Sequence, residues 1–185
     1  MYRQCTTEKT ASQQRLFQNT LLTCMQDHLY QDISVTDLCH QTGLSRNVFY
    51  RLFDHKEDVL YSLIDLYFLE CSQYVSANSS KEALLLYFSF WKKQKKLLDI
   101  LDRNHLGGLL AMRASVFCQQ TDISIRSYID TEYSSFYTEI FTFYIDGFIG
   151  LIIQWYRTGF ARTEEEMADI AFQFISKPPL HIKNP

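Results

Sequence analysis

The sequence predicts an all-α protein with two helical regions. Six glycines and three prolines are few helix breakers for 185 residues, so long uninterrupted helices are permitted. Apolar residues recur at helical spacing through most of the chain. At five points a Ser, Thr or Asp is followed three residues later by an acid or an amide, a pattern that marks helix starts because the two side chains satisfy unpaired backbone N–H groups. The pairs are Thr10 with Gln13, Ser34 with Asp37, Asp54 with Glu57, Ser79 with Glu82, and Thr163 with Glu166.

Charge and cysteine content narrow the class of protein. A net charge of −3 argues against a surface that is basic throughout. The five cysteines are odd in number, widely spaced and without a C-x-x-C pair, so we expect reduced thiols in a cytoplasmic protein. The polar first 14 residues and the short apolar stretch at 83–91 predict neither a secretion signal nor a membrane helix.

The first helix is expected to follow the Thr10 pair and to reach about Gln31. Its apolar residues repeat at i, i+3 and i+4, which predicts a single buried stripe. The stripe consists of Leu16, Phe17, Thr20, Leu21, Cys24, His28 and Leu29. We expect His28 to be a hydrogen-bonded core residue rather than a ligand.

Two short helices, 34–42 and 46–53, are predicted on either side of the turn Gly43-Leu44-Ser45. Gly43 occupies the position that must take a positive φ. Such a helix-turn-helix places its second helix in the major groove of DNA, although a glycine turn between short helices also occurs in bundles that never touch DNA. The apolar residues that would hold the two helices on the first are Val35, Leu38, Cys39, Leu44, Val48, Phe49, Leu52 and Phe53.

The remaining side chains of this region suit contacts to DNA. Arginine makes bidentate contacts to guanine and asparagine to adenine, while hydroxyl groups reach phosphates. The outward residues of the second helix are Ser45, Arg46, Asn47, Tyr50 and Arg51. Ser34 and Thr36 begin the preceding helix, where free N–H groups favour a phosphate, and Lys56 is expected to hold the flanking DNA backbone.

The stretch TGLSRNVFYRLFDHKEDVL resembles the DNA-binding region of the TetR family of transcription regulators. The resemblance implies DNA contacts at Thr36, Arg46, Asn47, Val48, Tyr50, Arg51 and Lys56. Two positions depart from the family pattern, which usually has Thr at Val48 and often Gly at Asn47. A common phosphate-binding hydroxyl is therefore missing, and no operator preference can be transferred.

The chain is divided into a DNA-binding domain at 1–54 and a helical regulatory and dimerisation domain at 55–185. Helices are expected at 54–77, 81–93, 106–120, 126–158 and 166–175, with Gly159 as a left-handed cap after the longest one. That longest helix carries too many apolar residues for one face, so its second side is expected to pack in a homodimer. The predicted interface residues are Phe148, Ile149, Ile152, Met167, Ile170 and Phe174. Gly147 and Gly150 would permit close approach there, or relieve crowding within one subunit.

The stretch YIDGFIGLIIQWYRTGFARTEEEMADIAFQFI resembles the C-terminal domain of a TetR subgroup that includes regulators of dihydroxyacetone-kinase operons. Some members of that subgroup work through a protein partner. The resemblance implies a ligand cavity, whose available wall residues are Tyr67, Cys71, Tyr74, Leu84, Tyr87, Phe88, Trp91, Phe117, Tyr137 and Tyr144. The same aromatic residues would fill a closed core equally well.

No pattern in the chain predicts an enzyme, a metal site or a cofactor. The five histidines lack metal-ligand spacing, and the neighbours Cys39 and His40 point to different helix faces. The predicted function is a homodimeric repressor that a small ligand releases from an inverted-repeat operator. The alternatives are an activator switched by a protein partner and a helical adaptor module that does not bind DNA.

Overall fold

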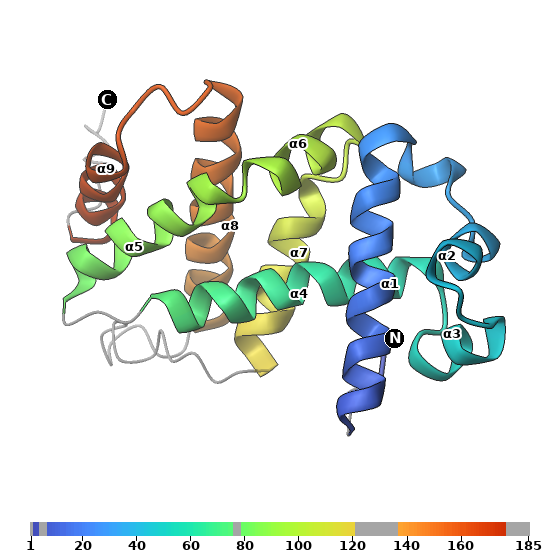
Figure 1. Ribbon diagram of the computed structural model, residues 1–185. Helices are drawn as coiled ribbons and strands as arrows, with labels where there is room; N and C mark the ends of the chain where they lie inside the picture. The colour runs from blue at the N-terminus through green and yellow to red at the C-terminus, as the bar shows by residue number, and fades with distance from the viewer. Residues whose placement is uncertain (1, 4–6, 76–78, 121–136, 177–185) are drawn as a thin grey trace. The chain divides into compact units, whose positions relative to one another are not determined.

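The computed structural model describes residues 2–3, 7–75, 79–120 and 137–176 (Figure 1). Within these ranges the chain is helical and no strand occurs, which confirms the all-α prediction. The elements are α1 (Glu8–Asp27), the 3-10 helix η1 (Tyr30–Asp32), α2 (Val35–Thr42), α3 (Arg46–Leu52), α4 (Lys56–Tyr74), α5 (Ser80–Lys93), α6 (Lys95–Arg103), α7 (Gly108–Gln120), α8 (Tyr137–Arg157) and α9 (Glu164–Ser176).

The helices form two compact units. The first unit contains Met1–Tyr67 and Lys96–Phe117, and the second contains Phe68–Lys95 and Cys118–Pro185. Helices α4 and α7 therefore contribute residues to both units. Most of α6 and α7 belongs to the same compact unit as the helix-turn-helix. The predicted functional boundary at residue 54 remains a prediction.

The core of the first unit lies where α1, α2 and α3 meet, with α2 and α3 stacked beside α1 (Figure 1). Burial of one large apolar side chain stabilises the fold by about 1.5–3 kcal/mol. The fully buried side chains here include Phe17, Leu21, Met25, Leu38, Phe49 and Phe53. Three helices too short or too polar to be stable alone are thus held by one shared apolar centre.

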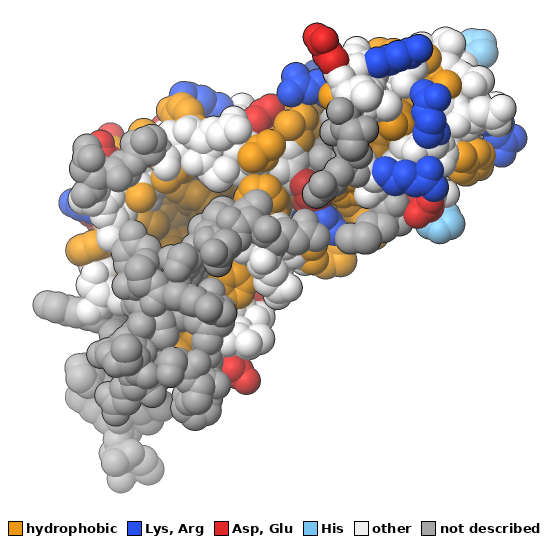
Figure 2. All heavy atoms as spheres, turned by 90° about the horizontal axis from the view of Figure 1, so that it is seen from below, with side chains coloured by type: hydrophobic (Ala, Val, Ile, Leu, Met, Phe, Trp, Pro, Cys, Tyr) orange, Lys and Arg blue, Asp and Glu red, His pale blue; other side chains and the backbone are white. Residues whose placement is uncertain are grey.

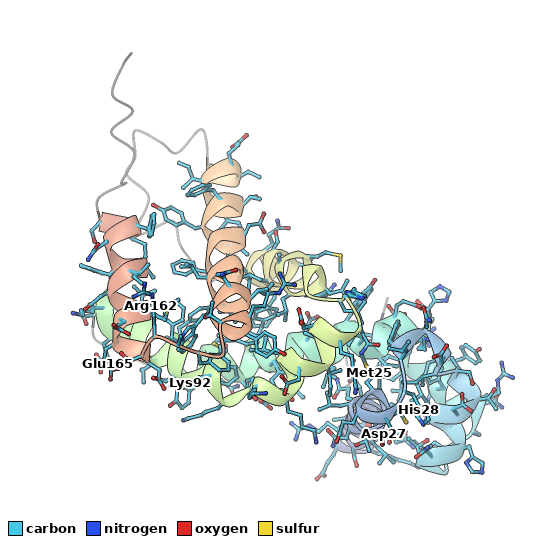
Figure 3. All side chains as sticks on the ribbon, turned by 90° about the horizontal axis from the view of Figure 1, so that it is seen from above. Met25, Asp27, His28, Lys92, Arg162 and Glu165 are labelled. Atoms are coloured by element: carbon cyan, nitrogen blue, oxygen red, sulfur yellow. The ribbon has the colours of Figure 1, made fainter. Side chains whose placement is uncertain are left out.

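Helix α1 begins earlier than predicted. Thr7 is its N-cap: the Thr7 hydroxyl accepts a hydrogen bond from the Thr10 backbone N–H, and the Thr10 hydroxyl accepts one from the Thr7 N–H, both at 3.2 Å. The pairing of Thr10 with Gln13 was therefore wrong, because a second threonine supplies the reciprocal oxygen one turn earlier. At the other end, His28 is the exposed C-cap rather than the core residue expected (Figure 3).

Three of the other predicted helix starts are confirmed. Ser34 and Asp37 form a reciprocal capping box at the start of α2, and Thr163 and Glu166 bond each other's backbone N–H groups before α9. Ser79 caps α5 by accepting a hydrogen bond at 3.2 Å from the backbone N–H three residues on. Each such cap contributes about 1 kcal/mol to helix stability.

The start of α4 uses a different acid from the one predicted. The carboxylate of Asp58, not of Glu57, accepts hydrogen bonds from the backbone N–H groups of Asp54 and His55, each at 3.0 Å. Asp58 is buried. A carboxylate one residue further into the helix thus satisfies the two free N–H groups of the turn between α3 and α4.

Helix α6 was not predicted, although its sequence carries the pattern for it. Four apolar residues on one face, Leu97, Leu98, Ile100 and Leu101, are buried. The end of this helix binds the end of α1, where the Arg103 guanidinium donates to the Met25 carbonyl oxygen. Asn104, the residue after α6, binds the start of η1, since its Oδ1 accepts from the Tyr30 N–H at 2.6 Å. The run KKQKK was interpreted only as the end of one helix. In the structure α5 ends and α6 begins within this run.

In the second unit α5 packs mainly against α9 and also against α8. Trp91 and Phe88 on α5 are fully buried, and Phe88 meets the ring of Trp155 on α8 edge-on at 5.7 Å. Lys92 on α5 forms an ion pair with Glu164 at 2.8 Å. Figure 3 shows Lys92 beside the loop that carries Arg162 and leads into α9.

The described part of α8 ends as predicted. Gly159 has a φ of 68° and follows a helix that ends at Arg157. The Phe160 N–H then donates to the Trp155 carbonyl oxygen at 2.9 Å, a hydrogen bond typical of a left-handed helix cap. The predicted stretch 126–136 lies outside the described residues.

Four cysteines in the described part have free thiols: Cys24, Cys39, Cys71 and Cys118. Burial raises the pKa of the Cys71 thiol to about 12 and that of Cys118 to about 11. Because the thiolate is the reactive form, the raised pKa disfavours reaction at buried Cys71 and at half-buried Cys118. Across the described helices, none combines the length and apolar character needed to cross a membrane.

Candidate nucleic-acid interface

Helix α3 rests on an aromatic base. The ring of Phe49 on α3 meets Phe17 on α1 edge-on, with ring centroids 5.3 Å apart, and Phe53 lies 5.4 Å from Phe49 and 6.0 Å from Phe17. All three side chains are completely buried. Aromatic packing of this kind fixes both the position and the rotation of a short helix. The opposite face of α3 is thereby held outward.

The turn before α3 has the conformation that the glycine predicted. Gly43 has a φ of 67°, and no atom lies within 4 Å of a Cβ placed there. The left-handed backbone, rather than crowding, is therefore the reason for glycine at this position. Ser45 then caps α3, with its hydroxyl accepting from the Val48 N–H. The observed turn confirms the predicted helix-turn-helix geometry.

The outward face of α3 carries four of the predicted contact residues. Arg46, Asn47, Tyr50 and Arg51 are exposed, whereas Val48 is half-buried. The Arg46 guanidinium donates to the Tyr50 hydroxyl at 3.4 Å and lies over its ring at 5.9 Å from the centroid. Tyr50 itself is 44% exposed, and its ring lies perpendicular to that of buried Phe49, with centroids 5.3 Å apart. The structure therefore places Tyr50 on the surface of α3.

The two hydroxyls at the start of α2 differ in availability. The Ser34 hydroxyl donates to the Asp37 carboxylate at 2.6 Å and also accepts from the Asp37 N–H. The hydrogen bonds that the Asp37 carboxylate accepts from the Ser34 hydroxyl and from the Ser34 backbone N–H lower the pKa of Asp37 below its usual value. Thr36, two residues further along the chain, is exposed. Thr36 is therefore the freer of the two predicted phosphate contacts.

Lys56 points into the protein rather than freely into solvent. Its Nζ donates to the Tyr30 carbonyl oxygen at 2.7 Å and to the Ile33 carbonyl oxygen at 2.6 Å, and it lies 4.2 Å from the centroid of the Tyr30 ring. Burial lowers the pKa of this ammonium. Lys56 has three N–H donors, so one donor remains for the predicted phosphate contact.

Two residues that sequence reasoning did not assign to this surface also contact α3. Gln13 on α1 accepts a hydrogen bond from the Arg51 guanidinium at 2.9 Å, and Arg3 binds the carbonyl oxygens at the end of α3. Gln13 had been given a capping role, and Arg3 lies in a polar stretch without periodicity. Nothing in the sequence pattern links either residue to α3, because both contacts join segments far apart in the chain.

The end of α8 and the loop after it are joined by contacts of the Trp155 side chain. The indole N–H of Trp155 donates to the Arg162 carbonyl oxygen at 3.0 Å, and the Trp155 ring packs against Phe160 at 4.8 Å.

Residues 78–177, more than half of the chain, match the TetR-type family described as "Transcriptional regulator C-terminal region". The chain belongs to the TetR family.

Solved TetR structures share this fold. A TetR transcriptional regulator from Streptococcus agalactiae aligns with a TM-score of 0.64 at 15% identity, over 90% of this chain and 95% of that chain. The fatty acid degradation regulator FadR from Bacillus halodurans gives 0.54 at 15%, over 96% and 100%. The dihydroxyacetone kinase operon activator DhaS gives 0.51 at 15%, over 88% and 93%. Comparison of the sequence with curated proteins gives no significant match.

Family membership defines the protein as a transcription regulator rather than an enzyme. The structural relatives support the TetR fold alone, because they share only 15% of residues with this chain.

The side chains predicted to line a ligand cavity in this TetR protein fall into three groups. Tyr67 and Phe117 belong to the first unit, and the Tyr137 side chain lies outside the description. The others belong to the second unit: Cys71, Tyr74, Leu84, Tyr87, Phe88, Trp91 and Tyr144. Within this group the Tyr74 hydroxyl is already occupied, because it accepts from Lys93 Nζ at 2.9 Å.

The residues predicted for a TetR dimer interface also divide. Ile149, Ile152 and Met167 are buried within the single chain, and Phe148 packs on Tyr87 with ring centroids 5.8 Å apart. Ile170 is half-buried. Phe174 is 51% exposed, and Phe143, which was not predicted, is 75% exposed. The exposed apolar surface of α8 and α9 is therefore carried by phenylalanines rather than by the aliphatic residues.

Proposed function

We propose that this TetR-family protein is a homodimeric repressor that binds an inverted-repeat operator and leaves it when a small ligand binds. The observation that carries the DNA-binding part is the face of α3, where Arg46, Asn47, Tyr50 and Arg51 are exposed on a helix fixed by buried Phe49. Direct readout requires side chains that reach base edges from a rigid support.

Arg46 and Asn47 are the residues proposed to read bases. Both lie in the first turn of α3, the part of a recognition helix that enters the major groove. The contact between Arg46 and Tyr50 holds the guanidinium at the helix surface before DNA arrives, which reduces the side-chain entropy lost on binding. Thr36 and the third donor of Lys56 are proposed to bind phosphates.

Exposed phenylalanines support the homodimer. Phe143 on α8 and Phe174 and Phe172 on α9 are large apolar side chains that a monomer would leave in water. A two-fold dimer uses the same patch on both subunits. The helices that present these residues are the ones proposed for the interface. The operator should then carry the same two-fold symmetry.

Two hydrogen-bond donors in the second unit support a small-molecule effector. The indole N–H of Trp91 is buried, lies near the Cys71 thiol and the Tyr87 phenol, and makes no well-aligned hydrogen bond to a described residue. The Tyr87 ring lies 6.4 Å from the Trp91 ring, and burial raises the pKa of the Tyr87 phenol well above its usual value. Tyr87 therefore stays protonated. An apolar ligand with an acceptor oxygen would match this pair of neutral donors.

The DNA-binding part is tested by titrating the protein against DNA from upstream of its own gene in a mobility-shift assay, followed by footprinting. We expect tight binding to that DNA over random DNA, and a protected site with an inverted repeat. Absence of binding to any DNA would instead favour the adaptor module. A protected site without two-fold symmetry would contradict binding as a dimer.

The effector part is tested with a reporter gene placed behind the operator. Trp91→Ala is expected to alter induction while leaving ligand-free operator binding within about twofold, since Trp91 lies outside the helix-turn-helix. Deletion of the regulator should raise expression if it represses. Expression that falls on deletion, together with a requirement for a co-expressed protein, would favour an activator switched by a partner.

A further inference from the structure

The segment Tyr2-Arg3 binds the end of the recognition helix. The Arg3 backbone N–H donates to the Leu52 carbonyl oxygen at 3.0 Å, and the Arg3 guanidinium donates to the Arg51 carbonyl oxygen at 3.1 Å. These carbonyl groups belong to the last turn of α3, where a helix leaves acceptors unpaired and favours a cation. Both the backbone and the side chain of Arg3 are thus positioned by α3.

A buried anchor holds the same segment one residue earlier. The Tyr2 hydroxyl donates to the Asp65 carboxylate, which also receives two hydrogen bonds from Arg113, one of them at 2.9 Å from Nε. The side chains of Asp65 and Arg113 are nearly buried. A carboxylate bound from two sides in this way has little freedom to move. Tyr2 therefore fixes the chain immediately before Arg3.

The Arg3 guanidinium remains available to a ligand despite these contacts. Its side chain is 61% exposed, and one of its five N–H donors is used by the Arg51 carbonyl group. Its ion pair with Asp54 spans 3.8 Å between exposed groups, and such pairs contribute little. A phosphate can replace that carboxylate. Figure 2 shows a row of Lys and Arg side chains on the face of the first unit turned to the viewer.

The location of Arg3 matches the spacing of a DNA groove. Arg46 opens α3 and Arg3 binds its far end, so the two residues are separated by the length of a seven-residue helix, about 10 Å. The major groove is about 12 Å wide and is bordered by phosphates. A helix that presents Arg46 to the bases therefore brings its other end close to the DNA backbone.

We propose that Arg3 is a further DNA-contacting residue, which binds a backbone phosphate at the edge of the groove read by α3. This inference rests on the proposed DNA binding. Arg51 lies beside Arg3 and is held by Gln13 at 2.9 Å, so the end of α3 presents two positioned guanidinium groups. Arginine suits this role because its planar fork binds phosphate oxygens in pairs. A phosphate contact adds affinity for every DNA sequence alike.

The test compares the full-length protein with Arg3→Ala and Arg3→Lys over a range of salt concentrations, on both the operator and random DNA. For Arg3→Ala we expect weaker binding by a similar factor on both DNAs, and a slope of log K against log salt that is smaller by about 1. Arg3→Lys should keep the slope because it keeps the charge. Arg162→Ala, which removes an exposed arginine of the second unit, should match the wild type.

The outcomes separate this inference from the proposed function. If the wild type binds DNA and Arg3→Ala has the same affinity and slope, Arg3 makes no phosphate contact and the inference fails alone. A loss of affinity with an unchanged slope, or one that Arg3→Lys does not restore, would mean that Arg3 only supports α3 and would also overturn it. If the wild type binds no DNA, the proposed function itself fails.

Discussion

The ammonium group of Lys56 donates a hydrogen bond to the carbonyl oxygen of Ile33 at 2.6 Å. This contact joins the first turn of α4 to the residue that precedes the cap of α2, and a second hydrogen bond to Tyr30 strengthens it. Lys56, which was predicted to bind the DNA backbone, thus also links α4 to the segment that leads into α2. Its replacement should reveal both roles.

Lys56→Ala should lower the free energy of unfolding by about 1.5–3 kcal/mol, because two carbonyl groups lose a charged donor. It should also weaken binding to all DNA sequences alike and reduce the salt slope by about 1, since the third donor is predicted to reach a phosphate. Urea unfolding and DNA titration measure the two effects. Lys96→Ala, at an exposed position of the first unit, is the control. Unchanged stability would show that the two hydrogen bonds contribute nothing.

Arg46→Ala and Asn47→Ala should each cost about 1–3 kcal/mol of binding free energy on the operator and relax the preference for one base pair. Both side chains are exposed, so the fold should be unaffected and the melting temperature should stay near that of the wild type. Binding to a panel of operators with single base changes measures the preference. Equal losses on the operator and on random DNA would contradict a base-reading role.

Phe143→Asp combined with Phe174→Asp should convert a dimer into monomers, because each change places a charge at an exposed apolar position of the helices proposed for the interface. These exposed positions are better targets than Ile149, whose burial within one chain means that a charge there would unfold the protein. Light scattering gives the mass. Met112→Asp, a similar change at another exposed apolar side chain, is the control. A dimer mass for the double variant would place the interface elsewhere.

Arg113→Met should destabilise the protein by about 3–5 kcal/mol, because it leaves the nearly buried Asp65 carboxylate without its cation. Adding Asp65→Leu should recover much of that loss, since an apolar pair needs no partner charge. Thermal and urea unfolding of the two single variants and the double variant give the coupling between them. Additive losses would contradict a coupled pair.

The helix-turn-helix was predictable because its signals are local. Gly43 with its positive φ, the Ser34 and Asp37 box and the apolar positions of α3 all act within one turn of chain, and the structure has each of them. The turn chemistry could therefore be inferred without knowledge of the rest of the molecule.

Helix α6 and the start of α1 show where local signals misled. The run KKQKK contains both a helix end and a helix start, and periodicity alone does not locate a boundary between two helices that nearly touch. For α1, two overlapping pairs of capping residues competed, and Thr7 with Thr10 was used in place of Thr10 with Gln13. That exchange left the Gln13 side chain to bind Arg51.

The helical class, the helix-turn-helix and the identity of the side chains on the outer face of α3 follow from the sequence alone, because helix propensity, caps and periodicity depend on neighbours within four residues. The tertiary structure decided which charged groups are free and which are occupied. It turned Lys56 inward to the Ile33 carbonyl oxygen, brought Arg3 to the end of α3, and buried Ile149 while exposing Phe143. These outcomes depend on contacts between segments far apart in the chain, where the gain from a hydrogen bond or from burial is set by what packing brings within reach.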